Sequence, residues 1–376
     1  MINVFQPTLG EAELAAVGEV FASGWVGRGP RTKAFIDAFG SHIGVAPEHL
    51  VSVTSCTEGL FLAMEALGVG PGDEVVLPAV SFVGAANAIA ARGATPVFCD
   101  VDPRSLNPAV DDVERRTGPR TRAVLVLHYG GSPGGIAEIA AFCRERGVAL
   151  VEDAACSVAS AVGGTACGTF GDIGVWSFDP MKIVVGGDGG MMHVPDPALR
   201  AAITTRVNIG MSQESGMASA AAGGRWWEFD VRAFGRRSFG NDVLAAIAQV
   251  QLSRLPEFLA RRSEIAKRYD HEFADLDGVL CPPPLPDGHR SSHYLYWLQL
   301  APERRDALAA RLFELGIYTT FRYLPLHRMP VYGSVSSLPG AESAADRTLC
   351  LPLHQGLDDD EVGAVVDGVR SVLGGV

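Results

Sequence analysis

Short, nearly continuous apolar runs alternate with helical patterns between about residues 50 and 200. The runs are LVSVT (50–54), EVVLPA (74–79), TPVFCDV (95–101), AVLVLHY (123–129), VALVED (148–153) and GVWSF (174–178). Their continuous hydrophobicity predicts strands that are buried on both faces. Helix-like stretches such as EGLFLAMEALG and GIAEIAAFCRERG separate several of the runs. This alternation predicts an α/β fold with a mostly parallel sheet.

The second half of the chain has a different pattern. Residues 241–276 predict a long helix that is interrupted or bent at Pro256, and CPPPLPDGH (281–289) predicts an extended linker. A strand, HYLYWLQL, and two helical stretches near the C-terminus then predict a smaller α+β domain. We therefore expect a large domain over 1–250 and a small domain over 251–376, and residues 1–25 could pack on the small domain.

Residues 212–224, SQESGMASAAAGG, are small and polar, and we interpret them as a mobile loop.

Composition excludes several classes of protein. The chain has 376 residues, of which 47% are hydrophobic and 20% are charged, as in a globular enzyme. Its net charge of −12 and the absence of a basic stripe argue against nucleic-acid binding. No apolar stretch has membrane-spanning length, and the N-terminus lacks the basic start of a signal peptide. The seven cysteines form no CxxC pair, so we expect no disulfide framework, no metal site and a cytoplasmic location.

Lys182 is a rare residue type in an apolar setting, SFDPMKIVVGGDGGM. The chain has 31 lysines and arginines, and lysine occurs only at positions 33, 182 and 267. Burial lowers the pKa of an amine, and a neutral amine can form a Schiff base, most often with pyridoxal phosphate. An ordinary lysine that reaches into water from the end of a strand is an equally weighted alternative for this residue alone.

Asp153 ends the run VALVED, at the edge of the sheet where α/β proteins bind ligands. Pyridoxal enzymes need an acid that keeps the pyridine nitrogen protonated. A helix cap or a salt-bridged acid is the alternative. Glu152 should point to the opposite face of the sheet and be structural.

Three further side chains could hold the same cofactor. The segment TSCTEGL joins a strand to a helix, so Thr57 and nearby backbone N–H groups could bind a phosphate, although simple capping by Thr57 is favoured in isolation. Ser177 could add a second hydroxyl. Phe82 could lie on a cofactor ring, although core packing is favoured for a lone phenylalanine.

The loop FGRRSFGND carries Arg236 and Arg237, which are either solvated charges or a phosphate contact.

Two other segments offer substrate contacts. The glycine-rich SGWVGRGP holds Trp25 and Arg28 and could close over a nucleotide-bearing substrate, or it could be a surface turn. It lacks the strand and helix that flank a dinucleotide fingerprint. The segment YLPLH places Tyr323 and His327 in the small domain, where a packed Tyr and a surface His are the alternative.

The order of these motifs resembles the DegT/DnrJ/EryC1/StrS family of sugar aminotransferases. The resemblance runs from GEAELAAVGEVFASGWVGRGP to LPLHQGLDDDEV, which is nearly the whole chain. It implies a PLP-dependent transferase fold of type I, and a homodimer with shared active sites. It also implies transfer of an amino group, usually from L-glutamate, to a keto sugar on a nucleotide diphosphate.

The resemblance also implies residue roles. Lys182 matches the lysine that forms the internal aldimine, and Asp153 matches the partner of the pyridine nitrogen. Phe82 matches the stacking aromatic, and Thr57 and Ser177 match phosphate ligands. The remaining matched or candidate positions are Cys56, Cys156 and Arg237 for the cofactor, the last from the neighbouring subunit, and Trp25, Arg28, Tyr323 and His327 for the substrate.

Two positions depart from the family pattern EDAAQAHG. Cys156 replaces a Gln expected near the 3-hydroxyl of the cofactor, and Val158 replaces a His. The hydrogen bonds around the cofactor are therefore expected to differ here.

The resemblance favours a C4 aminotransferase acting on a dTDP-4-keto-6-deoxyhexose, in secondary metabolism or polysaccharide synthesis. A C3 aminotransferase acting on a dTDP-3-keto-6-deoxyhexose is the alternative. A non-catalytic regulator of the same fold is a further alternative, but it predicts loss of Lys182 or Asp153. Desulfuration is disfavoured, because 212–224 holds no cysteine.

Overall fold

The computed structural model describes the chain except residues 212–219, 221–224, 226, 334–336 and 375–376. The mobile loop expected over 212–224 lies almost entirely outside the described residues. The described part is built on a seven-stranded sheet with the order β1-β9-β8-β5-β4-β2-β3. These strands are β1 (Leu50–Val53), β2 (Glu74–Pro78), β3 (Thr95–Cys99), β4 (Thr121–Leu127), β5 (Ala149–Asp153), β8 (Ile173–Ser177) and β9 (Gly190–His193).

The predicted, mostly parallel sheet is confirmed. Neighbouring strands from β3 through β2, β4 and β5 to β8 are parallel, whereas β9 is antiparallel to both β8 and β1. The six apolar runs all form strands of this sheet. The strand β9 was not predicted, because its four residues follow a glycine-rich turn and carry no alternating pattern.

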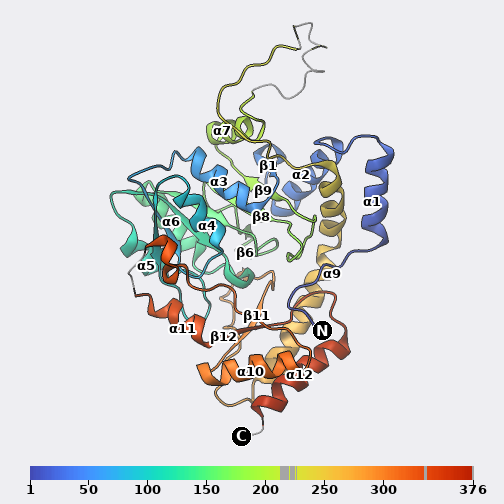
Figure 1. Cartoon of the computed structure of the whole chain (residues 1–376), viewed down its shortest axis with the longest axis vertical. Helices are drawn as coiled ribbons and strands as arrows, with labels where there is room; N and C mark the ends of the chain where they lie inside the picture. The colour runs from blue at the N-terminus through green and yellow to red at the C-terminus, as the bar shows by residue number, and fades with distance from the viewer. Residues whose placement is uncertain (212–219, 221–224, 226, 334–336, 375–376) are drawn as a thin grey trace.

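Helices cover both faces of the sheet (Figure 1). Successive residues of β4, such as Val124 and Leu125, belong to different core clusters on the two faces. One face packs against α5 (Val110–Arg116) and α6 (Ile136–Arg146), and the other against α3 (Cys56–Ala66) and α4 (Val83–Ala90). This two-sided burial explains why the strands are apolar throughout.

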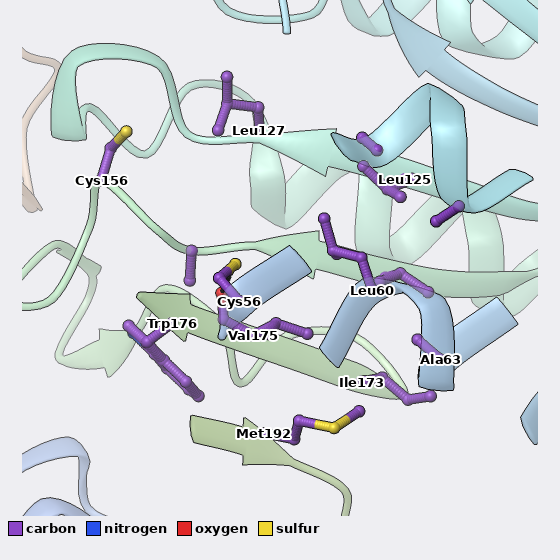
Figure 2. Packing of buried hydrophobic residues seen from close by; sticks show 14 of the residues in the cluster. Cys56, Leu60, Ala63, Leu125, Leu127, Cys156, Ile173, Val175, Trp176 and Met192 are labelled. Atoms are coloured by element: carbon purple, nitrogen blue, oxygen red, sulfur yellow. Dashed lines mark hydrogen bonds between the residues drawn. The ribbon is translucent and has the colours of Figure 1, made fainter. Parts of the chain in front are cut away.

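The helix α3 lies very close to the sheet. A Cβ atom on Gly59 would lie 2.5 Å from Cγ1 of Val175 on β8. Leu60 and Ala63 of α3 also face the strands that carry Val175 and Met192 (Figure 2). The start of α3 is therefore fixed against the end of β8.

The long helix α9 (Asp242–Phe273) runs unbroken through Pro256, so the interruption predicted there is not observed. The division expected between residues 250 and 251 falls inside this helix. Two N-terminal helices, α1 (Glu11–Ala22) and α2 (Pro30–Ile43), pack against it.

The C-terminal part has its own core. Strands β11 (Tyr296–Gln299) and β12 (Thr348–Leu351) pair antiparallel, and α10 (Pro302–Glu314), α11 (Pro339–Arg347) and α12 (Asp359–Leu373) accompany them. The N-terminus joins this part, because the backbone of Ile2 accepts a 2.9 Å hydrogen bond from Tyr318.

Shorter elements complete the fold. They are α7 (Pro197–Val207), β6 (Ala161–Val162), β7 (Thr165–Ala166), β10 (His289–Arg290), and the 3₁₀ turns η1 (Pro47–His49), η2 (Tyr129–Gly131), η3 (Leu326–Arg328) and η4 (Pro330–Tyr332). Across the described residues, no helix has the length and apolarity needed to span a membrane.

Candidate functional site

A cavity of about 320 Å³ opens at the carboxyl ends of the parallel strands. This is where the topology of an α/β sheet places ligands. The cavity is lined by Ser55, Cys56, Thr57, Leu60, Phe82, Leu127, Asp153, Ala155, Ser177, Asp179, Met181, Lys182, Asp188, Arg322 and Tyr323. Seven of the sequence-derived candidates therefore share one cavity, although they are spread over more than 260 positions.

Lys182 lies in the turn after β8, and its side chain is 9% exposed. Its Nζ lies 3.7 Å from Oδ2 of Asp179 and 3.5 Å from the hydroxyl oxygen of Tyr294. The backbone N–H of Lys182 donates to the carbonyl of Asp179, which closes the turn. The amine thus faces the cavity and does not reach into water.

The pKa of Lys182 differs from the expectation. Burial has the largest effect and lowers the pKa, but Tyr294, Cys156, Tyr323 and Asp179 outweigh it and raise the pKa above its ordinary value. Burial also raises the pKa of two of these neighbours, that of Tyr294 to about 12 and that of Cys156 to about 11. With only the protein's own side chains around it, Lys182 thus has a raised pKa. The expectation that burial makes this amine neutral is therefore wrong. A proton must leave Nζ before the amine can attack a carbonyl.

Asp153 is the last residue of β5 and is 2% exposed. Its Oδ1 accepts a 3.1 Å hydrogen bond from the N–H of Ala155, and Sγ of Cys56 lies 3.7 Å away. Burial raises the pKa of this carboxyl, while that hydrogen bond and the charge of Lys182 oppose the rise.

Glu152 points to the opposite face, as expected. Its carboxylate accepts hydrogen bonds from the N–H groups of Gly168, Phe170 and Gly171, and it lies 3.0 Å from Nε2 of His128. Four partners account fully for this buried acid as a structural residue.

The N-terminus of α3 forms one end of the cavity. Ser55, and not Thr57, caps this helix, because Oγ of Ser55 accepts a 3.0 Å hydrogen bond from the N–H of Glu58. The Thr57 hydroxyl is therefore left facing the cavity. A Cβ atom on Gly84 would lie 3.2 Å from Oγ1 of Thr57, so the glycine keeps this end open. Ser177 reaches the same cavity from the end of β8.

Phe82 is 42% exposed, so it is not a core residue. Its ring lies 5.8 Å from that of Tyr323, with an interplanar angle of 59°. Cys156 is buried near the site but does not line the cavity. Val158, at the second position that departs from the family pattern, accepts a hydrogen bond through its backbone from His42.

Besides Cys156, four further candidates lie outside the cavity. Nε1 of Trp25 donates to the carbonyl of Arg28, and Arg28 lines a separate groove of about 710 Å³. Arg237 is exposed, and its guanidinium lies 5.3 Å from the ring of Phe239. His327 is buried and contacts Glu342 at 3.1 Å.

Arg236 makes ion pairs with Glu58 and Glu65 at 2.9 and 2.8 Å. It is therefore neither a freely solvated charge nor a cavity residue of its own subunit.

Sequence reasoning missed four residues around Lys182. Asp179 and Met181 belong to the segment that drew attention to Lys182, so their proximity in sequence could have identified them. Arg322 is adjacent to the candidate Tyr323. Tyr294 offered no such signal, because an aromatic residue beside an apolar strand is most simply a core residue.

The comparisons with known proteins agree with this geometry. Residues 7–370 match the DegT/DnrJ/EryC1/StrS aminotransferase family. The chain is 58% identical to a dTDP-4-dehydro-2,3,6-trideoxy-D-glucose 4-aminotransferase of Saccharopolyspora spinosa, over 99% of this chain and 97% of the relative.

Solved structures are also similar. The aminotransferase TlmJ of Streptoalloteichus hindustanus has a TM-score of 0.96 at 63% identity and covers 100% of this chain and 99% of its own. The sugar aminotransferase CalS13 of Micromonospora echinospora has a TM-score of 0.89 at 31% identity, with coverage of 99% and 100%.

Proposed function

Because the chain belongs to the DegT/DnrJ/EryC1/StrS aminotransferase family, we propose that it moves an amino group from L-glutamate to C4 of a dTDP-4-keto-6-deoxyhexose, with pyridoxal phosphate as cofactor. The family and the type I fold expected from the sequence are confirmed. The aminotransferase activity expected from the sequence is confirmed as well, by the family and by a named relative at 58% identity. One observation carries the detailed proposal: Lys182 and Asp153 are both buried at one cavity.

The residues of the cavity fit pyridoxal phosphate. The first N–H groups of α3 and the hydroxyls of Thr57 and Ser177 would hold the phosphate, because a helix N-terminus attracts anions. Asp153 would face the pyridine nitrogen. Phe82 would stack on one face of the cofactor ring. Its phenyl ring is exposed at the cavity and is therefore available for this contact. Bound in this way, the cofactor would supply an aldehyde that carries the amino group and a ring that accepts electrons from the substrate's Cα.

The chain's own residues then have separate tasks. Lys182 would bind the aldehyde and afterwards move the proton at Cα of the amino donor through its Nζ. Asp179 and Tyr294, at 3.7 and 3.5 Å, orient that nitrogen. Asp153, ionised, would hold a proton on the ring nitrogen. The regulator alternative is not supported, since both Lys182 and Asp153 are present and buried at the cavity.

The C4 position is supported by the relative that is named a 4-aminotransferase. A direct test supplies the protein with L-glutamate and, separately, 4-keto and 3-keto dTDP-6-deoxyhexoses. Amination of the 4-keto sugar is expected. Amination of the 3-keto sugar alone would favour the C3 alternative.

A second copy of the chain would complete the site. Arg237 lies in the segment before α9, close in sequence to several large apolar side chains that are exposed. They are Ile209, Trp227, Phe229, Val231 and Phe234. In a homodimer these five side chains would be covered, and Arg237 would reach the partner's phosphate. The seven free cysteines support a cytoplasmic location.

Mixed dimers test this arrangement. Dimers that combine a Lys182→Ala subunit with an Arg237→Ala subunit should contain one complete site and recover activity. Activity no higher than the sum of the two variants would contradict a shared site.

A further inference from the structure

The cavity contains a guanidinium that has no acidic partner. Its charged lining residues are Asp153, Asp179, Asp188, Lys182 and Arg322. Lys182 lies beside Asp179, whereas Arg322 makes no ion pair with any of the described residues. A positive charge that lines a cavity without a carboxylate partner is available to an anionic ligand.

Aromatic stacking holds Arg322 in place. Its Cζ lies 4.7 Å from the ring of Phe5 and 5.9 Å from that of Tyr323, and its Nη2 lies 3.1 Å from Sδ of Met181. Stacking on a ring leaves the N–H groups at the edge of the guanidinium free to donate. Arg322 is therefore positioned by its face and can bind through its edge.

The same aromatic residues connect Arg322 with the amine. Phe5 stacks on Tyr294 with ring centroids 5.4 Å apart, and the hydroxyl of Tyr294 lies 3.5 Å from Nζ of Lys182. Met181, which contacts Arg322, directly precedes Lys182 in the chain. A ligand held by Arg322 would thus lie beside the reacting nitrogen.

We propose that Arg322 binds the α-carboxylate of the amino-acid donor. This inference rests on the proposed function, in which the donor is L-glutamate. The donor is anionic, and three carboxylates of the cavity would repel it. The planar fork of Arg322 matches a carboxylate with two parallel hydrogen bonds. The α-carboxylate is the group next to the transferred amine, so binding it would place that amine near Lys182.

The test is Arg322→Gln in the holoenzyme, assayed in each half-reaction. The KM for L-glutamate should rise about ten- to a hundredfold, the range for losing hydrogen bonds to a charged group. Arg322→Lys keeps the charge without the fork and should show a smaller rise. Arg311→Gln, which changes an exposed arginine paired with Glu314 on α10, is the matched control and should leave the KM unchanged.

The choice of donor separates the carboxylates. 4-Aminobutyrate keeps the side-chain carboxylate of glutamate but lacks the α-carboxylate. The preference of the wild type for L-glutamate over 4-aminobutyrate should fall in Arg322→Gln by about the factor by which the KM rises. An unchanged preference overturns the assignment to the α-carboxylate.

The second half-reaction distinguishes donor from acceptor. Enzyme loaded with pyridoxamine phosphate should aminate the keto sugar with the same KM in wild type and Arg322→Gln. A raised KM for the keto sugar together with an unchanged KM for L-glutamate overturns the proposal. If the wild type itself does not use L-glutamate, the proposed function fails. If the wild type uses L-glutamate and Arg322→Gln has the same KM for it, the proposed function stands and only the role of Arg322 is overturned.

Discussion

The hydroxyl oxygen of Tyr294 lies 3.5 Å from Nζ of Lys182, and that nitrogen lies 4.8 Å from the centre of the tyrosine ring. The two residues are separated by 112 positions. Lys182 follows the central sheet, whereas Tyr294 precedes the first strand of the C-terminal part. The contact therefore joins the two parts of the chain at Nζ of Lys182.

Tyr294→Phe should lower the turnover number about tenfold, because the ring stays stacked on Phe5 while the oxygen that orients Lys182 is lost. Cofactor binding and the unfolding temperature should change little. Steady-state kinetics measures the turnover number, the absorption spectrum reports cofactor binding, and thermal unfolding gives the unfolding temperature. Tyr296→Phe is the control, since that hydroxyl bonds to Asp270 away from the cavity, and it should not lower turnover. Equal kinetics for Tyr294→Phe and wild type would contradict the role of Tyr294.

Asp153→Asn should lower turnover by about a hundredfold or more, because an amide cannot stabilise the proton on the ring nitrogen. The side chain keeps its size, so the cofactor should still bind to Lys182. Stopped-flow absorbance after addition of L-glutamate measures the effect. Asp172→Asn is the control, because its carboxylate accepts from Leu150 near the opposite end of β5. Near-normal rates for Asp153→Asn would show that the acid does not serve the ring.

Gly59→Ala should destabilise the protein by about 1–3 kcal/mol, because the new methyl group would meet buried Val175 at 2.5 Å. Gly18→Ala on the exposed face of α1 is the matched control. Apart from its chain neighbours and the backbone of its own helix, no atom lies within 4 Å of its Cβ position, so this change should stabilise the protein by about 0.5–1 kcal/mol. Urea unfolding compares the two. Equal stability changes would contradict the close packing of α3 on β8.

His193 should make stability fall in mild acid. Burial, with a smaller effect of His49, lowers its pKa from 6.5 to about 4. Between these values the unfolded chain binds more protons than the folded one, so the free energy of unfolding falls as the pH falls. The contribution of His193 to the free energy of unfolding is fully present above pH 6.5 and is lost as the pH falls towards 4. It amounts to about 1–3 kcal/mol. Urea unfolding at several pH values should give a shallower dependence for His193→Gln, and an identical dependence would refute this.

The parallel sheet and the residues at its edge were predictable from the sequence. Continuous apolar runs identify buried strands, and Asp153 and Ser177 are the last residues of two of them. Strand β9 was not predictable, because it is antiparallel, short and set by pairing with β1 and β8. The ionisation of Lys182 was also mispredicted, since it depends on Tyr294 and Asp179 as well as on burial.

Contacts between distant segments account for the other differences. Arg322 and Tyr294 meet through Phe5, which lies near the N-terminus, and no local sequence pattern links these three residues to one another. Trp25, Arg28, Arg237 and His327 do not line the cavity of their own subunit. Their proposed roles depend on a second copy or on a bound substrate, which one chain's sequence does not describe.

The spectrum of Lys182→Ala, reconstituted with pyridoxal phosphate, tests the central claim most directly. Wild-type protein should show the long-wavelength absorption of cofactor bound covalently to an amine, and L-glutamate should shift it. Lys182→Ala should lack that band and turnover, whereas Lys33→Ala, at an exposed lysine paired with Asp37, should keep both. A Lys182→Ala protein that retains the band and transaminates at the wild-type rate would contradict the account.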